Sequence, residues 1–298
     1  MSDLLTDYIE DQALRGQTPY TLRAKRIRTR TWLVWCEAHD LDPCGVTRND
    51  LLSYLQECRA RNLKAATLRK LFANLSTFYE FLQDAGKSGS AGEVRAIQKK
   101  YIHAYKSDGE ARQIISIQEA GWLVGATFST RDRAILLLLL KTGIRRTELT
   151  SLDVEDVSLQ DMSIRLKPTG KRSNRLVFFD HEAADALRRW LAVRRAKDPA
   201  LFASSRGTRI SGDAVRYAVV HAAENAGLHS SGAPLEERFG AHACRHWFTT
   251  HLLRAGMRRE YVQWLRGDAI REAVDIYYHI DPEDVRRAYL ACIPRLGV

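Results

Sequence analysis

Two arginines in short motifs a hundred residues apart could together hold a phosphate group. Arg145 lies in the motif TGIRRTEL, residues 142–149, and Arg245 lies in HACRHWFTTHLL, residues 242–253. A guanidinium group is planar and permanently charged, and it can donate two parallel hydrogen bonds to the non-bridging oxygens of a phosphate. If the fold brings both arginines together, they would stabilise the charge that develops during phosphoryl transfer without a metal ion.

A nucleophile for such a reaction is available near the end of the chain. The stretch DIYYHID, residues 275–281, contains two adjacent tyrosines, Tyr277 and Tyr278. A phenol has a pKa of about 10, so it attacks poorly unless its surroundings remove the proton. A tyrosine that attacks a phosphodiester forms a covalent phosphotyrosine, which divides one difficult step into two easier ones. The residues alone leave open which tyrosine attacks.

Together these motifs resemble those of the tyrosine recombinases, the integrase family that includes the Xer, Cre and lambda-integrase groups. TGIRRTEL resembles the first arginine box of the family, T-G-x-R-x-x-E-L, which implies that Arg145 is catalytic and that Glu148 supports it. HACRHWFTTHLL matches H-x-x-R-H-x-F-x-T-H-L-L, which implies catalytic roles for His242 and Arg245. Each motif alone is a weak signal, but their combination is specific.

The resemblance also implies the nucleophile and the reaction. The family spacing from Gly267 to its nucleophile selects Tyr277, and the pattern I-Y-x-H selects the same residue, so Tyr278 is a packing or DNA-facing neighbour. Tyr277 is expected to attack DNA and to leave a 3′-phosphotyrosyl protein and a free 5′-hydroxyl, while His242 accepts or shuttles the tyrosine proton. A second 5′-hydroxyl then displaces the tyrosine. The reaction keeps the bond energy, so we expect no ATP, metal or other cofactor.

Two further positions leave a choice open. The family takes the proton for the leaving 5′-oxygen from a lysine on a β-hairpin turn, and this chain offers Lys167 and Lys171, of which the alignment favours Lys171. In LRGDA, residues 265–269, Asp268 stands where most relatives have histidine or tryptophan. Because a carboxylate beside a phosphodiester would repel it, we expect Asp268 to point away, to contact an arginine or to be protonated. Catalysis would then be slower, or another donor would substitute.

The elements that must position these residues divide into two predicted domains. Residues 1–85 carry apolar stripes at helical spacing and no strand-like alternation, which predicts a bundle of four or five helices that acts as the core-binding, DNA-binding domain. The polar stretch GKSGSAG opens a predicted linker, residues 86–111. Residues 112–298 are predicted to be a mixed α/β catalytic domain with a C-terminal tail. The expected fold is therefore mainly α with a small β-sheet, and DNA would lie between the domains.

Local signals place the motifs within the predicted catalytic domain. Ser116 and Glu119 have the spacing of a capping box at a helix start. RDRAILLLLLKTG reads as a buried helix ending at Gly143, although seven consecutive apolar residues could equally be a strand by periodicity alone. MSIRLKP and RLVFFD flank the turn TGKRSN, which carries Lys171, and they predict a two-stranded hairpin.

The charge of the chain indicates a polyanionic partner. Among the 298 residues, 46 are lysine or arginine and 36 are aspartate or glutamate, which gives a net charge of +10. At helical spacing Arg23, Arg26 and Arg30 share one side and could follow a phosphate backbone, and Arg69 and Lys70 belong to a second basic group. The alternative is an ordinary solvated helix face. We expect double-stranded DNA as the partner.

Other classes of protein are disfavoured. The five cysteines are odd in number and include no C-x-x-C pair, which argues against a disulfide framework. His242, His246, Cys244 and His251 lie close in sequence, but no second cluster completes a zinc site, so we expect no metal. The longest apolar run, Ala134–Leu140, is too short to cross a membrane and no leader opens the sequence. We expect a cytoplasmic, nucleoid-associated protein.

We therefore predict a site-specific DNA recombinase that integrates or excises a mobile element, or that resolves chromosome or plasmid dimers. The resemblance implies a homotetramer on two DNA duplexes with specific recombination sites, in which the tail from residue 281 onward docks on a neighbouring subunit. Two alternatives stay open: a type IB topoisomerase-like DNA relaxase that uses the same chemistry without partner exchange, and a catalytically weakened DNA-binding relative.

Overall fold

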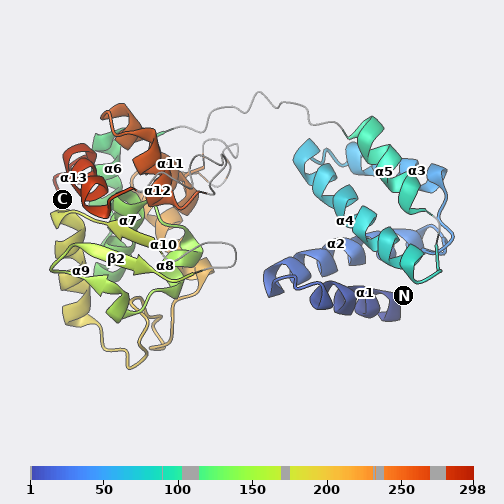
Figure 1. Cartoon of the computed structure of the whole chain (residues 1–298), viewed down its shortest axis with the longest axis horizontal. Coiled ribbons are helices and arrows are strands. Elements are labelled where there is room, and N and C mark those ends of the chain that lie inside the picture. Colours follow the sequence, from blue (N-terminus) through green and yellow to red (C-terminus); the bar gives the residue numbers. More distant parts are fainter. Residues whose placement is uncertain are drawn as a thin grey trace. The chain divides into compact units, whose positions relative to one another are not determined.

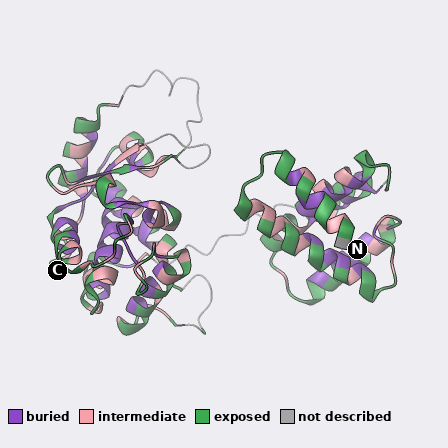
Figure 2. Ribbon diagram, turned by 90° about the horizontal axis from the view of Figure 1, so that it is seen from below, coloured by how far each residue is buried: buried purple, intermediate pink, exposed green. Residues whose placement is uncertain are grey.

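The chain folds into two units, Met1–Gly109 and Glu110–Val298. The structure is a computed structural model, and it describes residues 2–88, 90–102, 114–168, 175–230, 232, 238–268 and 280–298. Figure 1 shows the elements of each unit and Figure 2 the residues that each unit buries, and each unit has its own apolar core. A chain of this length can supply two such cores, because each unit is large enough to remove a substantial apolar area from water.

The described part of the N-terminal unit contains five helices: α1 (Ser2–Leu14), α2 (Pro19–Ala38), α3 (Arg48–Ala60), α4 (Ala65–Asp84) and α5 (Ala91–Tyr101). Local sequence sets two of their starts, since Thr18 caps α2 and Thr47 forms a capping box with Asp50 at α3. The core is rich in aromatic rings. The buried Trp32 Nε1 donates a hydrogen bond to the Tyr79 hydroxyl at 3.1 Å, so both polar atoms are satisfied inside the bundle.

Helix α5 falls within the stretch predicted as a linker, residues 86–111. It packs against α3 and α4, and Ala91, Val94 and Ile97 are buried in the N-terminal core. These three residues recur every three positions and so lie on one side of the helix. The helical bundle therefore extends past the predicted boundary at residue 85.

The second unit contains the following described elements: α6 (Ile117–Gly125), α7 (Thr130–Thr142), α8 (Arg146–Ser151), the 3₁₀ helix η1 (Val154–Asp156), β1 (Val157–Ser158), β2 (Ser163–Leu166), β3 (Arg175–Phe178), α9 (His181–Val193), α10 (Gly212–Asn225), α11 (Ala241–Arg254), α12 (Arg259–Arg266) and α13 (Pro282–Cys292). The prediction of a mainly α fold with a small β-sheet is confirmed. Among the residues that the structure describes, no helix has both the length and the apolar character needed to span a membrane.

Helix α7 lies at the centre of the second unit (Figure 1). Its residues from Ala134 to Thr142 are all buried, because α6, α8, α9, α10, α11 and β3 contact it. A helix covered on every side needs apolar side chains around its whole circumference, which explains why no helical period is visible in the sequence. The helix prediction is confirmed, and α7 ends at Gly143 as expected. Glycine is required there, since its φ is 59° and an added Cβ would lie 2.3 Å from Phe248 Cδ1.

The three strands form one antiparallel sheet in the order β1-β2-β3. β2 and β3 are the two strands of the predicted hairpin, paired with Ser163 opposite Phe178 and Leu166 opposite Arg175. β1 adds a third strand that was not predicted. The residues of the hairpin turn, 169–174, lie outside the described residues, and Arg175 is the first residue of β3 after them.

The C-terminal residues pack against their own unit. The buried Tyr289 of α13 donates its hydroxyl to the carbonyl of Lys141 at 2.8 Å. The buried Lys141 ammonium donates to the carbonyl of Pro294 at 2.6 Å, and Glu182 of α9 accepts the backbone N–H of Leu296 at 3.0 Å. The tail, for which the family resemblance implies docking on a neighbouring subunit, lies in this single chain against α7 and α9.

Candidate active site

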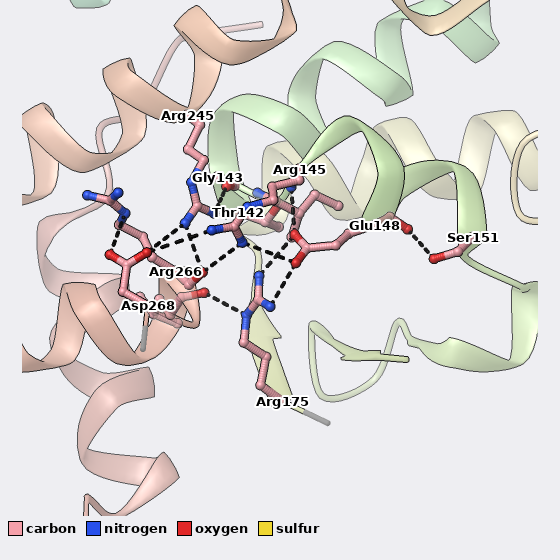
Figure 3. Close-up of polar contacts among 11 residues, drawn as sticks. Thr142, Gly143, Arg145, Glu148, Ser151, Arg175, Arg245, Arg266 and Asp268 are labelled. Carbon is pink, nitrogen blue, oxygen red and sulfur yellow. Dashed lines mark hydrogen bonds and ion pairs between the residues drawn. The ribbon is translucent and has the colours of Figure 1, made fainter. Parts of the chain in front are cut away.

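Arg145 and Arg245, called the arginine pair below, meet at the C-terminal end of α12 (Figure 3). Arg145 immediately precedes α8, and Arg245 lies on α11. Both donate a hydrogen bond to the carbonyl oxygen of Arg266, from Arg145 Nη1 at 3.2 Å and from Arg245 Nη2 at 2.8 Å. Arg245 Nη1 also donates to the carbonyl of Gly143 at 2.7 Å. The fold therefore brings two guanidinium groups from distant motifs to one place.

The carboxylate of Glu148 holds Arg145. Only 2% of Glu148 is exposed, and its two oxygens accept the backbone N–H of Arg145 at 2.7 Å and Nη1 of the same residue at 3.2 Å. Burial alone would raise the pKa of Glu148, but hydrogen bonds from Arg175 and from the Arg145 amide outweigh burial and lower the pKa overall. Glu148 is therefore ionised at neutral pH, and its contacts orient Arg145.

Arg175 was missed by the sequence reasoning, yet it joins three parts of the site. Its Nη1 and Nη2 donate to the two oxygens of Glu148 at 2.9 and 3.0 Å, and its Nε donates to the carbonyl of Leu265 at 3.1 Å. Gly267 lies so close that an added Cβ would be 2.7 Å from Arg175 Nη1. Arg175 opens the predicted strand RLVFFD, but its partner on another element cannot be read from local spacing.

The arginine pair concentrates positive charge in a poorly solvated place. The side chain of Arg245 is 5% exposed and that of Arg145 is 25% exposed. Burial lowers the pKa of Arg245, and the charges of Arg145 and Arg266 lower it further, to about 9. The guanidinium still carries its charge at neutral pH. Fixed charges of this kind in a site with little water stabilise an anion strongly, so the pair is suited to a phosphate whose charge grows during transfer.

Asp268 contacts the arginines, which is one of the three outcomes expected from the sequence. Its Oδ1 lies 3.4 Å from Arg245 Nη2 and 3.7 Å from Arg145 Nη2, and its Oδ2 lies 3.1 Å from Arg266 Nε. The side chain is 32% exposed. The carboxylate therefore does not point away from the site, and it neutralises part of the arginine charge.

His242 lies on α11 one turn before Arg245, so both side chains leave the same side of the helix. The His242 ring packs edge-on against His246, with ring centroids 4.7 Å apart. His251 has a different environment, since its Nε2 lies 3.1 Å from the carbonyl oxygen of Ile115 and burial lowers its pKa. Within the described parts of the chain, no group of histidine, cysteine, aspartate and glutamate residues could hold a metal ion.

The residues expected to transfer protons and to attack are described only in part. Lys167 is described, and its ammonium contacts Asp153 and, at 3.3 Å, Asp156. The hydrogen bond to Asp153 raises the pKa of Lys167 above its ordinary value. Lys171 and Tyr277, together with the tyrosine that follows it, lie outside the described residues.

The cations predicted to contact DNA are exposed on α2 and α4 of the N-terminal unit, namely Arg23, Arg26, Arg30, Arg69 and Lys70. Lys25, in the same basic stretch, has an internal role. Its ammonium donates to the hydroxyls of Tyr8 at 3.2 Å and Thr77 at 2.9 Å, and burial lowers its pKa. The basic stretch is therefore divided between a solvent-facing set of arginines and one lysine that belongs to the bundle.

The sequence matches the model of the phage integrase family over residues 107–284. Among curated relatives, the tyrosine recombinase XerC of Corynebacterium glutamicum is 32% identical over 239 residues, which cover 77% of this chain and 73% of that protein. The tyrosine recombinase XerC of Chromobacterium violaceum is 28% identical over 301 residues, which cover 99% of this chain and 96% of that protein.

Solved structures share the fold. The Tn1549 transposon integrase in complex with transposon right end DNA has a TM-score of 0.69 at 19% identity, over 96% of this chain and 98% of that one. A lambda integrase dimer bound to a COC′ core site has a TM-score of 0.69 at 17% identity, over 95% of this chain and 99% of that one. Both likenesses extend over nearly the whole chain and show that the fold is shared.

Proposed function

The chain belongs to the phage integrase family of tyrosine recombinases, and from that premise we propose that the arginine pair binds the scissile phosphate of its DNA substrate. The protein is a site-specific DNA recombinase. One observation carries the proposal for the site: Arg145 and Arg245 reach the same carbonyl oxygen while Glu148 holds Arg145 in place. Two guanidinium groups that reach the same carbonyl oxygen are close enough for each to bind a non-bridging oxygen of one phosphate.

In the proposed reaction, the hydroxyl oxygen of Tyr277 attacks the phosphorus, and the bond from phosphorus to the 5′-oxygen breaks. A 3′-phosphotyrosine and a 5′-hydroxyl result, with His242 accepting the phenol proton and Lys171 donating a proton to the leaving oxygen. The arginine pair stabilises the charge on the non-bridging oxygens while these bonds change. Attack by the 5′-hydroxyl of a second strand reverses the chemistry, so the energy of the broken bond is kept.

The contacts of Lys167 support Lys171 as the general acid. Lys167 is bonded to Asp153 and Asp156, and its pKa is raised, so it gives up a proton less readily than an ordinary lysine. Lys171→Gln should therefore slow cleavage far more than Lys167→Gln. A substrate whose 5′-oxygen is replaced by sulfur needs no proton on its leaving group, and it should restore cleavage by Lys171→Gln. Restoration of Lys167→Gln alone would assign the role to Lys167 instead.

The wider assembly is part of the same proposal. We propose that the protein acts as a homotetramer on two duplexes with specific recombination sites, for integration and excision or for dimer resolution, in the cytoplasm at the nucleoid. Residues 1–85 together with α5 would grip the DNA backbone through the exposed arginines of α2 and α4, and residues 112–298 would cleave it. The relatives named XerC and the DNA-bound integrase structures support this assignment.

A nicked duplex tests the cleavage chemistry. The recombination site is first selected from a random-sequence pool with the Tyr277→Phe variant, which should bind DNA without reacting. On a duplex nicked beside the cleavage position, the short strand diffuses away and the protein stays attached to DNA. Wild type and Tyr278→Phe should form this adduct, and Tyr277→Phe should not. Absence of any adduct from wild type would refute the proposal, and the reverse pattern would assign Tyr278 as the nucleophile.

Plasmids with one or two copies of the selected site test strand exchange. A recombinase should yield recombined products only when two sites are present. Relaxation of supercoiled plasmid that carries no site, without recombined product, would instead indicate a relaxase.

A further inference from the structure

The turn that ends α12 places Asp268 beside the arginine pair. Gly267 adopts a left-handed φ of 58°, and the backbone N–H of Asp268 donates to the carbonyl oxygen of Gln263 at 3.2 Å. Arg175 also holds this end of the helix, because its Nε donates to the carbonyl of Leu265 at 3.1 Å. Hydrogen bonds therefore hold the backbone before the turn, at Leu265, and after it, at Asp268. They fix the place from which the Asp268 side chain extends toward the arginines (Figure 3).

The Asp268 carboxylate lies within reach of both members of the arginine pair. Its Oδ1 is 3.4 Å from Arg245 Nη2 and 3.7 Å from Arg145 Nη2. Strong charge-assisted hydrogen bonds are about 2.7–2.9 Å long, so neither contact is tight. The other oxygen is closer to a third cation, at 3.1 Å from Arg266 Nε. Only the contact from Arg245 Nη2 has the geometry of a hydrogen bond, so the carboxylate is held by one long hydrogen bond and by the charges of Arg145 and Arg266.

This arrangement is an anion site occupied by a group from the chain itself. Arg245 is almost completely buried between Arg145 and Arg266, and an anion beside it offsets the repulsion among these charges. The neighbouring carboxylate, Glu148, has both oxygens engaged in other hydrogen bonds. Asp268 remains 32% exposed, so a ligand that enters from solvent can compete with it.

We propose that Asp268 is an internal ligand of the arginine pair and that the scissile phosphate must displace it before cleavage. The proposal rests on the function assigned above, in which the pair binds that phosphate. A carboxylate and a phosphodiester are both anionic, and they repel each other strongly at contact distance in a site with little water. Once displaced, Asp268 keeps its contact with Arg266, while Arg145 and Arg245 turn their donors to the phosphate.

Displacement of Asp268 makes cleavage selective. When the other contacts of a cognate DNA site hold the phosphate firmly, displacement is nearly complete and the rate is hardly affected. When a DNA lacks those contacts, the carboxylate remains bound in a fraction of the complexes, and cleavage falls in proportion to that fraction. Asp268 therefore suppresses cleavage at sites that bind weakly.

Asp268→Asn removes the charge and keeps the size of the side chain, so it tests the proposal directly. The measurement is the rate of adduct formation on nicked duplexes with the selected site and with a mutated site. On the mutated site, Asp268→Asn should react about three- to fivefold faster than wild type, as expected for the loss of one partly exposed ion pair. On the selected site the change should be smaller.

Loss of any carboxylate increases the attraction of the protein for DNA, so a matched control is needed. Asp185→Asn removes an exposed carboxylate of α9 that pairs with Arg188 on the same helix. It should leave the ratio of rates on the two duplexes unchanged. Thermal unfolding checks that Asp268→Asn is folded. If the folded variant reacts more slowly than wild type on the mutated site, Asp268 positions the arginines, and if it reacts at the same rate, Asp268 has no role. Either result overturns the proposal.

A binding measurement separates this proposal from the assigned chemistry. Tyr277→Phe and the double variant Tyr277→Phe with Asp268→Asn are compared for affinity to the mutated duplex, where no cleavage is needed. The double variant should bind about three- to fivefold more tightly at equal salt. Equal affinities would overturn the displacement of Asp268, even if wild type forms its adduct as expected. If wild type forms no adduct but the double variant binds more tightly than Tyr277→Phe, only the cleavage chemistry is refuted.

Discussion

Replacement of Arg175 by methionine should lower the free energy of unfolding of the second unit by about 3 kcal/mol. The side chains of Arg175 and Glu148 are 9% and 2% exposed, and hydrogen bonds of 2.9 and 3.0 Å join them. Methionine fills similar space without charge and leaves a buried carboxylate with fewer partners. Breaking a buried pair from one side costs about 3–5 kcal/mol. The lower end applies because Arg145 still donates two hydrogen bonds to Glu148.

Thermal unfolding measures this loss. At about 2–4 °C per kcal/mol for a domain of this size, the Tm of the second unit should fall by about 6–12 °C. Arg188→Met is the matched control, because Arg188 pairs with Asp185 at the surface, with side chains 52% and 60% exposed, and such pairs contribute about 0–1 kcal/mol. Comparable shifts in Tm for Arg175→Met and Arg188→Met would refute the importance of the buried pair.

Two further variants refine the test of Arg175. Arg175→Met combined with Glu148→Gln should lose less stability than the sum of the two single changes, because each single change leaves a buried group unpaired. Arg175→Lys keeps the charge but cannot donate two parallel hydrogen bonds, so it should form the DNA adduct about tenfold more slowly while regaining part of the lost Tm. A wild-type rate for Arg175→Lys would mean that this bidentate contact does not position Arg145.

Three other predictions follow from single contacts. Gly143→Ala should lower the free energy of unfolding, measured in urea, by about 3 kcal/mol, because φ is left-handed at 59° and the new Cβ would lie 2.3 Å from a ring carbon of Phe248. Gly256→Ala is the control: φ is also positive there but the surrounding space is open, so the loss should be about 1 kcal/mol. Because folding lowers the pKa of Glu148 below 4.5, its ionised form stabilises the fold above that pH and loses this effect as the pH falls through the folded pKa. The difference in Tm between wild type and Glu148→Gln should therefore narrow as the pH falls below 4.5. Arg30→Gln should reduce the salt slope of DNA binding by about one unit, while Lys25→Gln, which replaces the ammonium that bonds Tyr8 and Thr77 with a shorter amide, should mainly lower Tm.

Interactions between residues close in the chain were predicted well. Ser116 and Glu119 form the capping box that their spacing predicted, and α7 ends at Gly143 as expected. The supporting contact between Glu148 and Arg145 has the same origin, since a spacing of three residues at a helix start brings the carboxylate back to the backbone amide. The assignments of Tyr277 and Lys171 stay predictions, because both residues lie outside the described part of the chain.

Interactions between distant elements were not predictable in the same way. The run of leucines in α7 was compatible with a helix or a strand until its neighbours were known, because burial on all sides removes the period that distinguishes the two. Helix α5 was assigned to a linker because the small, polar stretch GKSGSAG precedes and overlaps it, yet three apolar residues on one side are enough to pack it on α3 and α4. Arg175 became part of the site only through its contacts with Glu148 and the end of α12.

The sequence by itself identified the family of this recombinase, because its arginine, histidine and tyrosine motifs are specific in combination, while the roles of the individual residues stay predictions. It also determined the start of α6, through a capping box, and the end of α7, through a glycine, because both depend on contacts within one turn. The three-dimensional packing of α8, α11, α12 and β3 determined the rest: that Arg145 and Arg245 share one carbonyl, that Arg175 joins Glu148, and that Asp268 contacts three arginines. Those contacts depend on how helices and strands pack across tens of residues, which local spacing does not encode.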